Sequence, residues 1–277
     1  MSPDLPICIT CGTQLASAEP PPTACSVCED DRQYVRAGGQ AWTTRGAMLG
    51  HYRNAVTEVE PGLTGIVTEP GFAIAQRAHL VQTPAGNVLW DCISHLDDET
   101  VAAVNGLGGL AAIALSHPHF QGAVVDWSRA FGDIPVYIHA DNAPWIVRSD
   151  PAIRFWDGET LDPLPGAGLT LIRCGGHFPG SAVLYWPGGA GGRGALLCGD
   201  TINVVSDPKW VSFMYSYPNA IPLDAGSVRR IVAAVEPVAF DRLYSAWEGR
   251  VVVADAKPAV ARSAKRYVAH LTGPAGA

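Results

Sequence analysis

The sequence contains few charged residues and no extended apolar stretch. Only 16% of its 277 residues are Asp, Glu, Lys or Arg, whereas 48% are hydrophobic. This composition excludes a disordered chain. Charged residues or prolines interrupt every apolar segment before the roughly 18 residues that would cross a bilayer, and the N-terminus lacks the basic and apolar regions of a signal peptide. We therefore expect a soluble, cytoplasmic protein that does not bind membranes.

Basic residues are also too few and too scattered for a nucleic-acid-binding surface. Lys and Arg number 19 against 26 Asp and Glu, the net charge is −7, and no basic run exceeds a pair. Because nucleic-acid binding requires clustered positive charge, we expect no such partner. Glycine and proline are plentiful, at 30 and 22 residues, which predicts many tight turns and excludes a long coiled coil.

Short apolar runs separated by turns predict a mixed α/β (α+β) protein with two mixed sheets and outer helices. The expected strands cover residues 65–69, 78–83, 88–92, 111–115, 136–139, 169–174, 181–186, 195–198 and 241–244. The expected helices cover 97–106, 124–131, 143–148, 224–236 and 254–271. Asp97 is the expected N-cap of the first helix, and Pro258 is expected to interrupt or restart the last. The glycine-rich stretch 188–194 precedes a strand and not a helix, so we interpret it as a hairpin turn.

The chain divides into three parts. Residues 1–35 are polar and too few to bury a core of their own, so something other than apolar packing must stabilise them. Residues 36–62 show no clear period and are predicted to form a connector that lies on the main domain. The strand pattern begins at Leu63, and the main domain is predicted over residues 63–277.

Four of the seven cysteines form two closely spaced pairs in the first part. The pairs are Cys8 with Cys11 and Cys25 with Cys28, with 13 residues between them. Two Cys-x-x-Cys knuckles at this spacing are typical of a structural zinc site with four thiolate ligands, and paired disulfides or a redox Cys-x-x-Cys motif are the alternatives. We therefore predict a zinc-ribbon-like unit that folds around its metal and performs no chemistry. The remaining cysteines lie in apolar sequence and are expected in the core: Cys92, Cys174 and Cys198.

Histidine and aspartate side chains follow three predicted strands. His117 and His119 come directly after strand 111–115, His177 lies in a glycine-rich turn after strand 169–174, and Asp200 follows strand 195–198. Residues two apart in extended chain point the same way, so both imidazoles of the His-x-His pair are expected to face one site. Strand ends that deliver His-x-His, His and Asp are arranged as in a metal centre.

These residues resemble the metallo-β-lactamase-fold superfamily, close to its glyoxalase II-like hydrolases. The resemblance rests on His117-Pro118-His119, on the segment 176–181 around His177, and on the segment 196–201 around Asp200, and it covers about residues 63–271. It implies a four-layer αββα sandwich. The strand that ends at Asp91 resembles the early strand of the family, so Asp91 is expected to orient a ligand histidine from behind.

Two departures from the family pattern concern its second metal ion. The usual first motif is His-x-His-x-Asp-His, but this chain has Gln121 and Gly122 at the last two positions. A late histidine is also missing, and Trp247 or Glu248 stands near its place. The resemblance therefore implies a mononuclear site made by His117, His119, His177 and Asp200, and leaves open whether Glu248 replaces the missing ligand.

The expected activity is hydrolysis of a small-molecule ester, thioester or amide-like bond through a metal-activated water, with zinc or iron in the site. A divalent metal bound by three neutral imidazoles and one carboxylate has a net charge of about +1. Its bound water is therefore less readily ionised to hydroxide at neutral pH than the water on a three-histidine zinc. Either Asp200 binds loosely and helps to deprotonate the water, or the metal mainly polarises a substrate carbonyl.

Two alternatives stay open at this point. A mononuclear iron oxygenase or lyase could use the same ligands, and a catalytically silent scaffold could serve protein association. The aromatic loop after Asp200 suggests a substrate pocket made by Tyr215, Tyr217 and Trp247. A homo-oligomer is compatible with the sequence.

Overall fold

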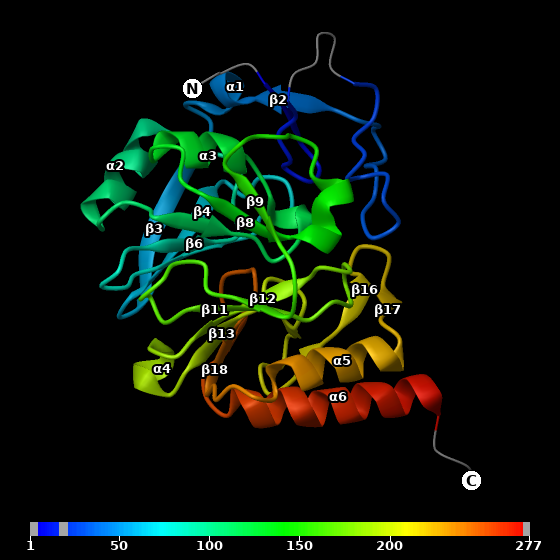
Figure 1. Ribbon diagram of the computed structural model, residues 1–277. Helices are drawn as coiled ribbons and strands as arrows, with labels where there is room; N and C mark the ends of the chain where they lie inside the picture. Colours follow the sequence, from blue (N-terminus) through cyan, green and yellow to red (C-terminus); the bar gives the residue numbers. More distant parts are fainter. Residues whose placement is uncertain (1–4, 17–21, 274–277) are drawn as a thin grey trace.

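The computed structural model describes residues 5–16 and 22–273. Figure 1 shows two β-sheets stacked face to face, with helices on the outer face of each. Seven strands form one sheet in the order β3-β4-β5-β6-β7-β8-β9, and six form the other in the order β10-β11-β12-β13-β18-β19. The predicted four-layer αββα sandwich is confirmed.

The seven-stranded sheet begins as an antiparallel meander and ends with parallel strands. Helices α2 (Asp98–Gly106) and α3 (Val124–Ala130) make the crossovers before β7 and β8, and the 3₁₀ segment η2 (Ala140–Trp145) precedes β9. The strands are β3 (Arg53–Glu60), β4 (Leu63–Glu69), β5 (Ala78–Val81), β6 (Val88–Trp90), β7 (Ala112–Ala114), β8 (Val136–His139) and β9 (Ile153–Trp156).

The six-stranded sheet is covered by α5 (Ala225–Val235) and α6 (Ala256–Thr272), which lie side by side at the bottom of Figure 1. Its strands are β10 (Thr160–Leu161), β11 (Thr170–Arg173), β12 (Ala182–Trp186), β13 (Ala195–Leu197), β18 (Arg242–Tyr244) and β19 (Val251–Val252). Between β13 and α5 the chain makes two small hairpins: β14 (Asn203–Val204) with β15 (Val211–Ser212), and β16 (Met214–Ser216) with β17 (Ile221–Pro222).

Three apolar layers hold the sandwich together. Alternating residues of a strand point to opposite faces, so Leu196 packs under α5 and α6 while Leu197 packs between the two sheets. Leu80 likewise packs under α2 and α3, and its neighbour Val81 packs between the sheets. All four side chains are fully buried. The predicted core cysteines Cys92, Cys174 and Cys198 are buried in the two outer layers.

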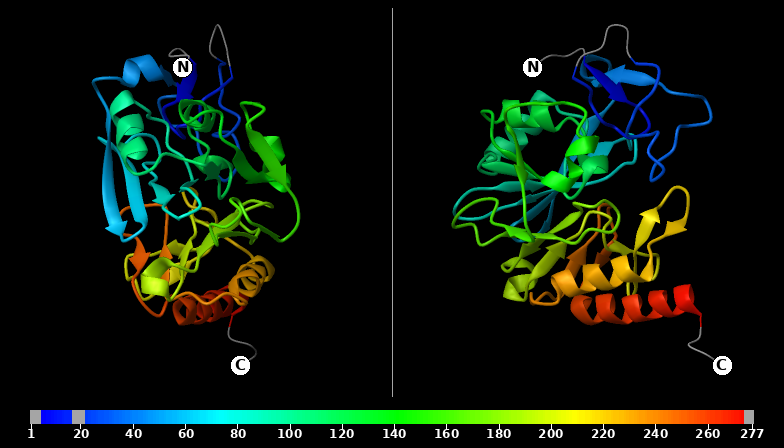
Figure 2. Two further views of the ribbon diagram at one scale, coloured as in Figure 1. Left: turned by 60° about the vertical axis from the view of Figure 1, so that its left-hand side comes forward. Right: turned by 45° about the vertical axis from the view of Figure 1, so that its right-hand side comes forward.

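The N-terminal segment lies against the seven-stranded half of the sandwich (Figure 2). Strand β1 (Pro6–Cys8) pairs with β2 (Trp42–Thr44), which leads into the short helix α1 (Arg45–Met48). Gln14 donates to Asp126 Oδ2 over 2.9 Å, Arg148 contacts both of these residues, and Ser94 Oγ donates to the Gly12 carbonyl over 2.6 Å. These buried contacts attach the segment to the sandwich.

The structure differs from the sequence predictions in three places. The predicted connector 36–62 contains β2, α1 and β3, and the main sheet begins at residue 53 because residues 61 and 62 form the β3–β4 turn. The predicted helix 143–148 is wrong: only residues 143–145 are helical, as the end of the 3₁₀ segment η2, and residues 146–148 are not helical. Pro258 does not interrupt α6, since it lies in the first turn, where its missing N–H needs no partner.

Two finer predictions are confirmed. Stretch 188–194, with the short helix α4 (Gly189–Gly192), connects the antiparallel strands β12 and β13 as expected of a hairpin turn. Asp97 caps α2 by accepting a hydrogen bond from Thr100 N. None of the described helices is long and apolar enough to cross a lipid bilayer.

Candidate metal centres

Three strand ends bring His117, His119, His177 and Asp200 together. His117 follows β7, and the 3₁₀ turn η1 (Pro118–Phe120) then brings His119 back beside it, with ring centroids 5.1 Å apart. Both imidazoles therefore face one site, as expected, but the backbone between them forms a turn and not the extended chain that the sequence analysis predicted. His177 follows β11 after two glycines at positive φ, and Asp200 follows β13 after Gly199.

The four residues offer one ligand atom each, and these atoms all lie within 4.8 Å of one another. His117 Nε2 is 3.3 Å from Asp200 Oδ1, His177 Nε2 is 3.8 Å from Asp200 Oδ2, and His177 Nε2 is 3.2 Å from His119 Nδ1. All four residues are buried. His117 Nε2 and Asp200 Oδ1 have no hydrogen-bond partner, although such buried polar atoms are normally satisfied. A metal ion would satisfy both, so this donor set fits one.

Hydrogen bonds behind the ligands fix two of the rings. Asp91 Oδ1 accepts from Ser116 N and from Ser116 Oγ, both over 2.7 Å, and Ser116 Oγ lies 2.9 Å from His117 Nδ1. His177 Nδ1 lies 3.2 Å from the Met214 carbonyl, which can only accept, so Nδ1 carries the hydrogen and the Nε2 lone pair faces the site. Asp91 therefore lies behind a ligand histidine, with Ser116 between them.

Burial sets the charge state of the cluster. It lowers the pKa of His117 and His119 well below the ordinary range and that of His177 to about 4. It raises the pKa of Asp200 to about 7 and that of Asp91 to about 8. The imidazoles are therefore neutral at neutral pH, which is the form that binds metals. A bound cation would favour the ionised form of Asp200.

The four positions at which the sequence resemblance implies a departure from a second metal site make other contacts. Gln121 donates to the Trp145 carbonyl over 3.2 Å. Gly122 has φ +48°, and a Cβ there would meet backbone atoms of Ile93 at 2.7 Å. Trp247 donates to the Ile74 carbonyl, and Glu248 lines a hollow beside Arg77. Among the described residues, no group of metal-binding side chains in the sandwich includes Glu248.

The four N-terminal cysteines form a second cluster. Cys8 Sγ is 3.6 Å from Cys28 Sγ and Cys11 Sγ is 3.7 Å from Cys25 Sγ, and all four sulfurs are buried free thiols. A tetrahedral zinc site with Zn–S bonds of about 2.3 Å has S–S edges of about 3.8 Å, close to these separations. Gly12, which directly follows the first cysteine pair, has a positive φ, and Gln40 Nε2 donates to Cys8 Sγ over 3.3 Å. The four thiolates fit a closed metal site.

Two of the three predicted pocket residues lie together. Tyr217 and Trp247 line a hollow of about 540 Å³ whose other walls include Asn203, Ser206 and Arg250. Tyr217 is tied to the metal cluster, because its Oη donates to the Asp200 carbonyl over 2.7 Å and its ring lies 6.0 Å from that of His177. The third, Tyr215, lies away from this hollow and donates to Asp31 Oδ1 over 2.6 Å.

Sequence reasoning missed two polar side chains near the cluster. Arg32 donates to the His177 carbonyl over 2.7 Å, and Ser116 joins Asp91 to His117. Ser116 immediately precedes the His-x-His pair, which was a usable signal, whereas nothing in the sequence around Arg32 indicates a contact 145 residues away.

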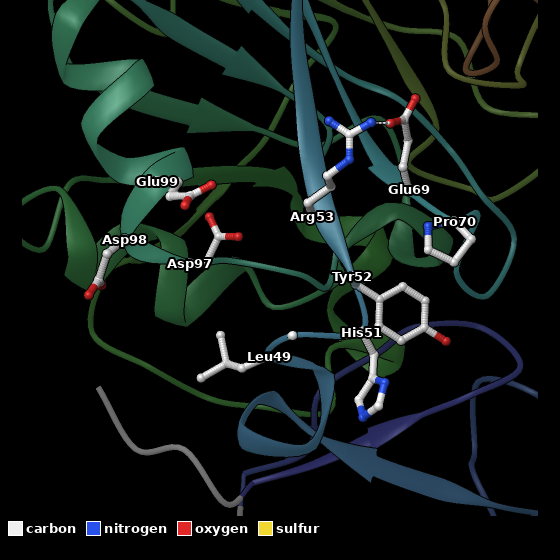
Figure 3. Close-up of a pocket in the computed structure, with 10 residues that line it drawn as sticks. Leu49, His51, Tyr52, Arg53, Glu69, Pro70, Asp97, Asp98 and Glu99 are labelled. Atoms are coloured by element: carbon white, nitrogen blue, oxygen red, sulfur yellow. Dashed lines mark hydrogen bonds and ion pairs between the residues drawn. The ribbon is translucent and has the colours of Figure 1, made fainter.

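A larger hollow of about 640 Å³ lies where β3 begins, beside the N-terminus of α2 (Figure 3). Two of its four carboxylates already have roles, since Asp97 caps α2 and Glu69 pairs with Arg53. None of its lining residues belongs to the cysteine cluster or to the histidine cluster. It is therefore separate from the candidate centres.

No model of a known protein family matches the chain. It is 51% identical over 264 residues to "Uncharacterized protein YmaE" of Bacillus subtilis (strain 168), with 95% of each chain covered. Solved structures of metallo-β-lactamases are similar in fold. TMB-1 matches with a TM-score of 0.58 and 15% identity over 79% of this chain and 99% of its own. DIM-1 matches with a TM-score of 0.58 and 13% identity, over 80% of this chain and 99% of its own.

An enzyme of Cronobacter sakazakii described by its HARLDQ motif matches with a TM-score of 0.51 and 17% identity, over 78% of this chain and 92% of its own. Identities this low establish the fold alone, whereas the 51% identity to YmaE over nearly the whole of both chains establishes common ancestry. The chain therefore has the metallo-β-lactamase fold and belongs to the family of YmaE.

Proposed function

We propose that the protein is a metal-dependent hydrolase that cleaves an ester, thioester or amide-like bond of a small molecule, using one metal ion. The observation that carries this proposal is the meeting of His117 Nε2 and Asp200 Oδ1, both buried and without hydrogen-bond partners, next to His119 and His177. The solved structures of this fold include metallo-β-lactamases, which supports hydrolysis as the reaction class.

The chain supplies a rigid, largely dehydrated ligand set. A divalent metal held there would polarise a substrate carbonyl and lower the pKa of a water molecule. Asp91 and Ser116 hold His117, and the Met214 carbonyl holds the His177 ring, so the nitrogens need little reorganisation to bind. Asp200 is the one carboxylate of the set, and it can accept the proton of the attacking water.

Substrate would approach through the hollow lined by Tyr217, Trp247 and Arg250. Tyr217 contacts both Asp200 and His177, so this hollow adjoins the ligand set. Its aromatic walls suit an apolar or aromatic portion of the substrate. For the N-terminal cysteines we propose a structural zinc ion that folds residues 1–35 and takes no part in hydrolysis.

Metal analysis of the His177→Ala variant tests the metal site. We expect two metal ions per chain in the wild-type protein and one in the variant, because the cysteine cluster is unaffected. The exposed His270 provides the control, and His270→Ala should keep both ions. Unchanged stoichiometry in His177→Ala would contradict the ligand assignment.

A panel of esters, thioesters and amides tests the reaction class. We expect metal-dependent turnover that His177→Ala abolishes and His270→Ala preserves. Protein purified without oxygen should be assayed in parallel. Stoichiometric iron that turns over with oxygen, or no turnover of any member of the panel, would contradict the hydrolase proposal.

A further inference from the structure

We propose that the N-terminal cysteine unit positions a ligand of the histidine cluster, and that Arg32 is the positioning residue. This inference rests on the metal site of the proposed function. It concerns the loop of residues 29–33, which directly follows Cys28 and lies beside the β16–β17 hairpin (Figure 2). Through this loop, the state of one metal centre determines the metal affinity of the other.

Arg32 is held on the backbone of His177. Its Nε donates to the His177 carbonyl over 2.7 Å, and its side chain is only 13% exposed. The guanidinium lies 4.6 Å from the ring centroids of both Phe178 and Tyr215 and 5.4 Å from that of Trp145. Arginine stacks favourably on aromatic rings, and these three rings fix the plane from which it donates.

Asp30 links Arg32 to the cysteine unit. Its two carboxylate oxygens accept from Arg32 Nη1 over 2.8 and 2.9 Å, and Oδ1 also accepts from Arg32 N over 3.0 Å. Trp145 Nε1 donates to Asp30 Oδ2 over 2.8 Å. Only Glu29 separates this carboxylate from Cys28, whose N–H donates to the Cys25 carbonyl. A metal ion that fixes Cys25 and Cys28 therefore fixes the start of the loop.

The same loop reaches His177 a second way, through the β16–β17 hairpin. Ser216 Oγ donates to the Arg32 carbonyl over 3.0 Å, and Asn219 Nδ2 donates to the carbonyls of Asp31 and Gln33 over 3.1 and 3.0 Å. The hairpin also carries the Met214 carbonyl that accepts from His177 Nδ1. The backbone of His177 is thus held by Arg32, and its imidazole is held by a hairpin that residues 31–33 contact.

Attachment of the N-terminal segment does not depend on Arg32. The buried contacts of Gln14 and Arg148 with Asp126, and of Ser94 with Gly12, join the segment to the sandwich elsewhere. Loss of the Arg32 side chain should therefore leave the segment docked and the cysteine site intact. Its effect should fall on the orientation of His177, where misplacement weakens metal binding.

Cobalt(II) titration of the full-length protein separates the two centres, because thiolate charge-transfer bands report the cysteine site and ligand-field bands report the histidine site. We expect Arg32→Ala to lower cobalt affinity at the histidine site about 10- to 100-fold and to change its ligand-field spectrum. The charge-transfer bands and the thermal unfolding midpoint should change little. Arg129→Ala is the matched control, since Arg129 forms an ion pair with Asp150 over 2.7 Å and should leave both sites unchanged.

A second pair of variants covers the case in which Arg32→Ala does not fold. Asp30→Asn keeps the shape of the side chain but removes the charge that pairs with Arg32. We therefore expect a smaller loss of cobalt affinity at the histidine site than in Arg32→Ala. Cys28→Ser should weaken both centres. This inference would be overturned if Arg32→Ala kept the wild-type cobalt affinity and spectrum at the histidine site. It would also be overturned if the two single variants Asp30→Asn and Cys28→Ser both kept them. Failure of the wild-type histidine site to bind cobalt would instead overturn the proposed function.

Discussion

Gly122 shows how a single side chain can be excluded from a site. Its φ of +48° lies in the left-handed region, and a Cβ there would meet the Ile93 carbonyl carbon and oxygen at 2.7 Å. Gln14 N also donates to the Gly122 carbonyl over 3.1 Å, so the N-terminal segment fixes this backbone. A histidine at position 122 would need both its own turn and the Ile93 backbone to move.

Substitution of Gly122 by alanine should therefore destabilise the protein more than a glycine replacement in open space. Gly132 is the matched control, since its φ is +92° and no atom lies within 4 Å of an added Cβ. Both variants carry the left-handed penalty of about 1–2 kcal/mol, and Gly122→Ala should add about 1–3 kcal/mol of overpacking. Urea unfolding measures both. Equal losses would show that the Ile93 backbone yields freely.

Ser116 should affect the metal site more than the fold. We expect Ser116→Ala to weaken metal binding at the histidine cluster about 10- to 100-fold, because His117 loses the hydroxyl that joins it to Asp91. Chelator competition measures this affinity. Ser128→Ala removes another buried hydroxyl, which donates to the Ile134 carbonyl, and should leave metal affinity unchanged. Equal affinities in the two variants would contradict the role of Ser116.

Residues that follow strands were predictable, and residues that meet through distant loops were not. His117, His177 and Asp200 each stand next to an apolar run that folds as a strand, so the sheet itself brings them together. Arg32 reaches His177 from a loop whose position depends on the cysteine unit and on the β16–β17 hairpin. No local pattern carries that information.

Helix α2 illustrates how local signals fix an element. Asp97 precedes an acidic first turn, and its side chain accepts from Thr100 N over 2.7 Å. Elements without such signals were missed: β14, β15, β17 and β19 are two residues long and exist only through their partners. The η2 segment contains Pro144, which disfavours a regular α-helix there.

Loss of the α2 cap should have a measurable cost. We expect Asp97→Ala to lower the free energy of unfolding by about 1 kcal/mol. Asp98 lies in the exposed first turn and makes no cap bond, so Asp98→Ala should cost only a few tenths of a kcal/mol. Thermal or urea unfolding of the two variants checks the difference, and a larger loss in Asp98→Ala would contradict this account.

The two sheets are joined by a buried carboxylate as well as by apolar packing. Glu60, at the end of β3, accepts from Tyr244 Oη over 2.8 Å, from Arg242 Nη1 over 2.6 Å and from Ala190 N over 3.1 Å. Burial raises the pKa of Tyr244 to about 12, so its phenol stays protonated and donates. This link crosses from the seven-stranded sheet to the six-stranded one.

Removal of that carboxylate should weaken the protein as a whole. We expect Glu60→Ala to destabilise it by about 3 kcal/mol, because Arg242 and Tyr244 lose their shared acceptor. Glu69→Ala is the control, since Glu69 pairs with Arg53 at the surface and should cost less than about 1 kcal/mol. Denaturant unfolding distinguishes the two. If Glu60→Ala lowered the free energy of unfolding as little as Glu69→Ala, apolar packing alone would hold the two sheets together.

The loop after Cys28 also has a consequence for the order in which the molecule assembles. The Asp31 carbonyl accepts from Asn219, 188 residues later in the chain. During synthesis the cysteine unit emerges before the sandwich and can close around its metal early, whereas the β16–β17 hairpin emerges only after the whole seven-stranded sheet. Contacts between such distant segments form slowly. The contacts around His177 are therefore completed late, after most strands of both sheets have emerged from the ribosome.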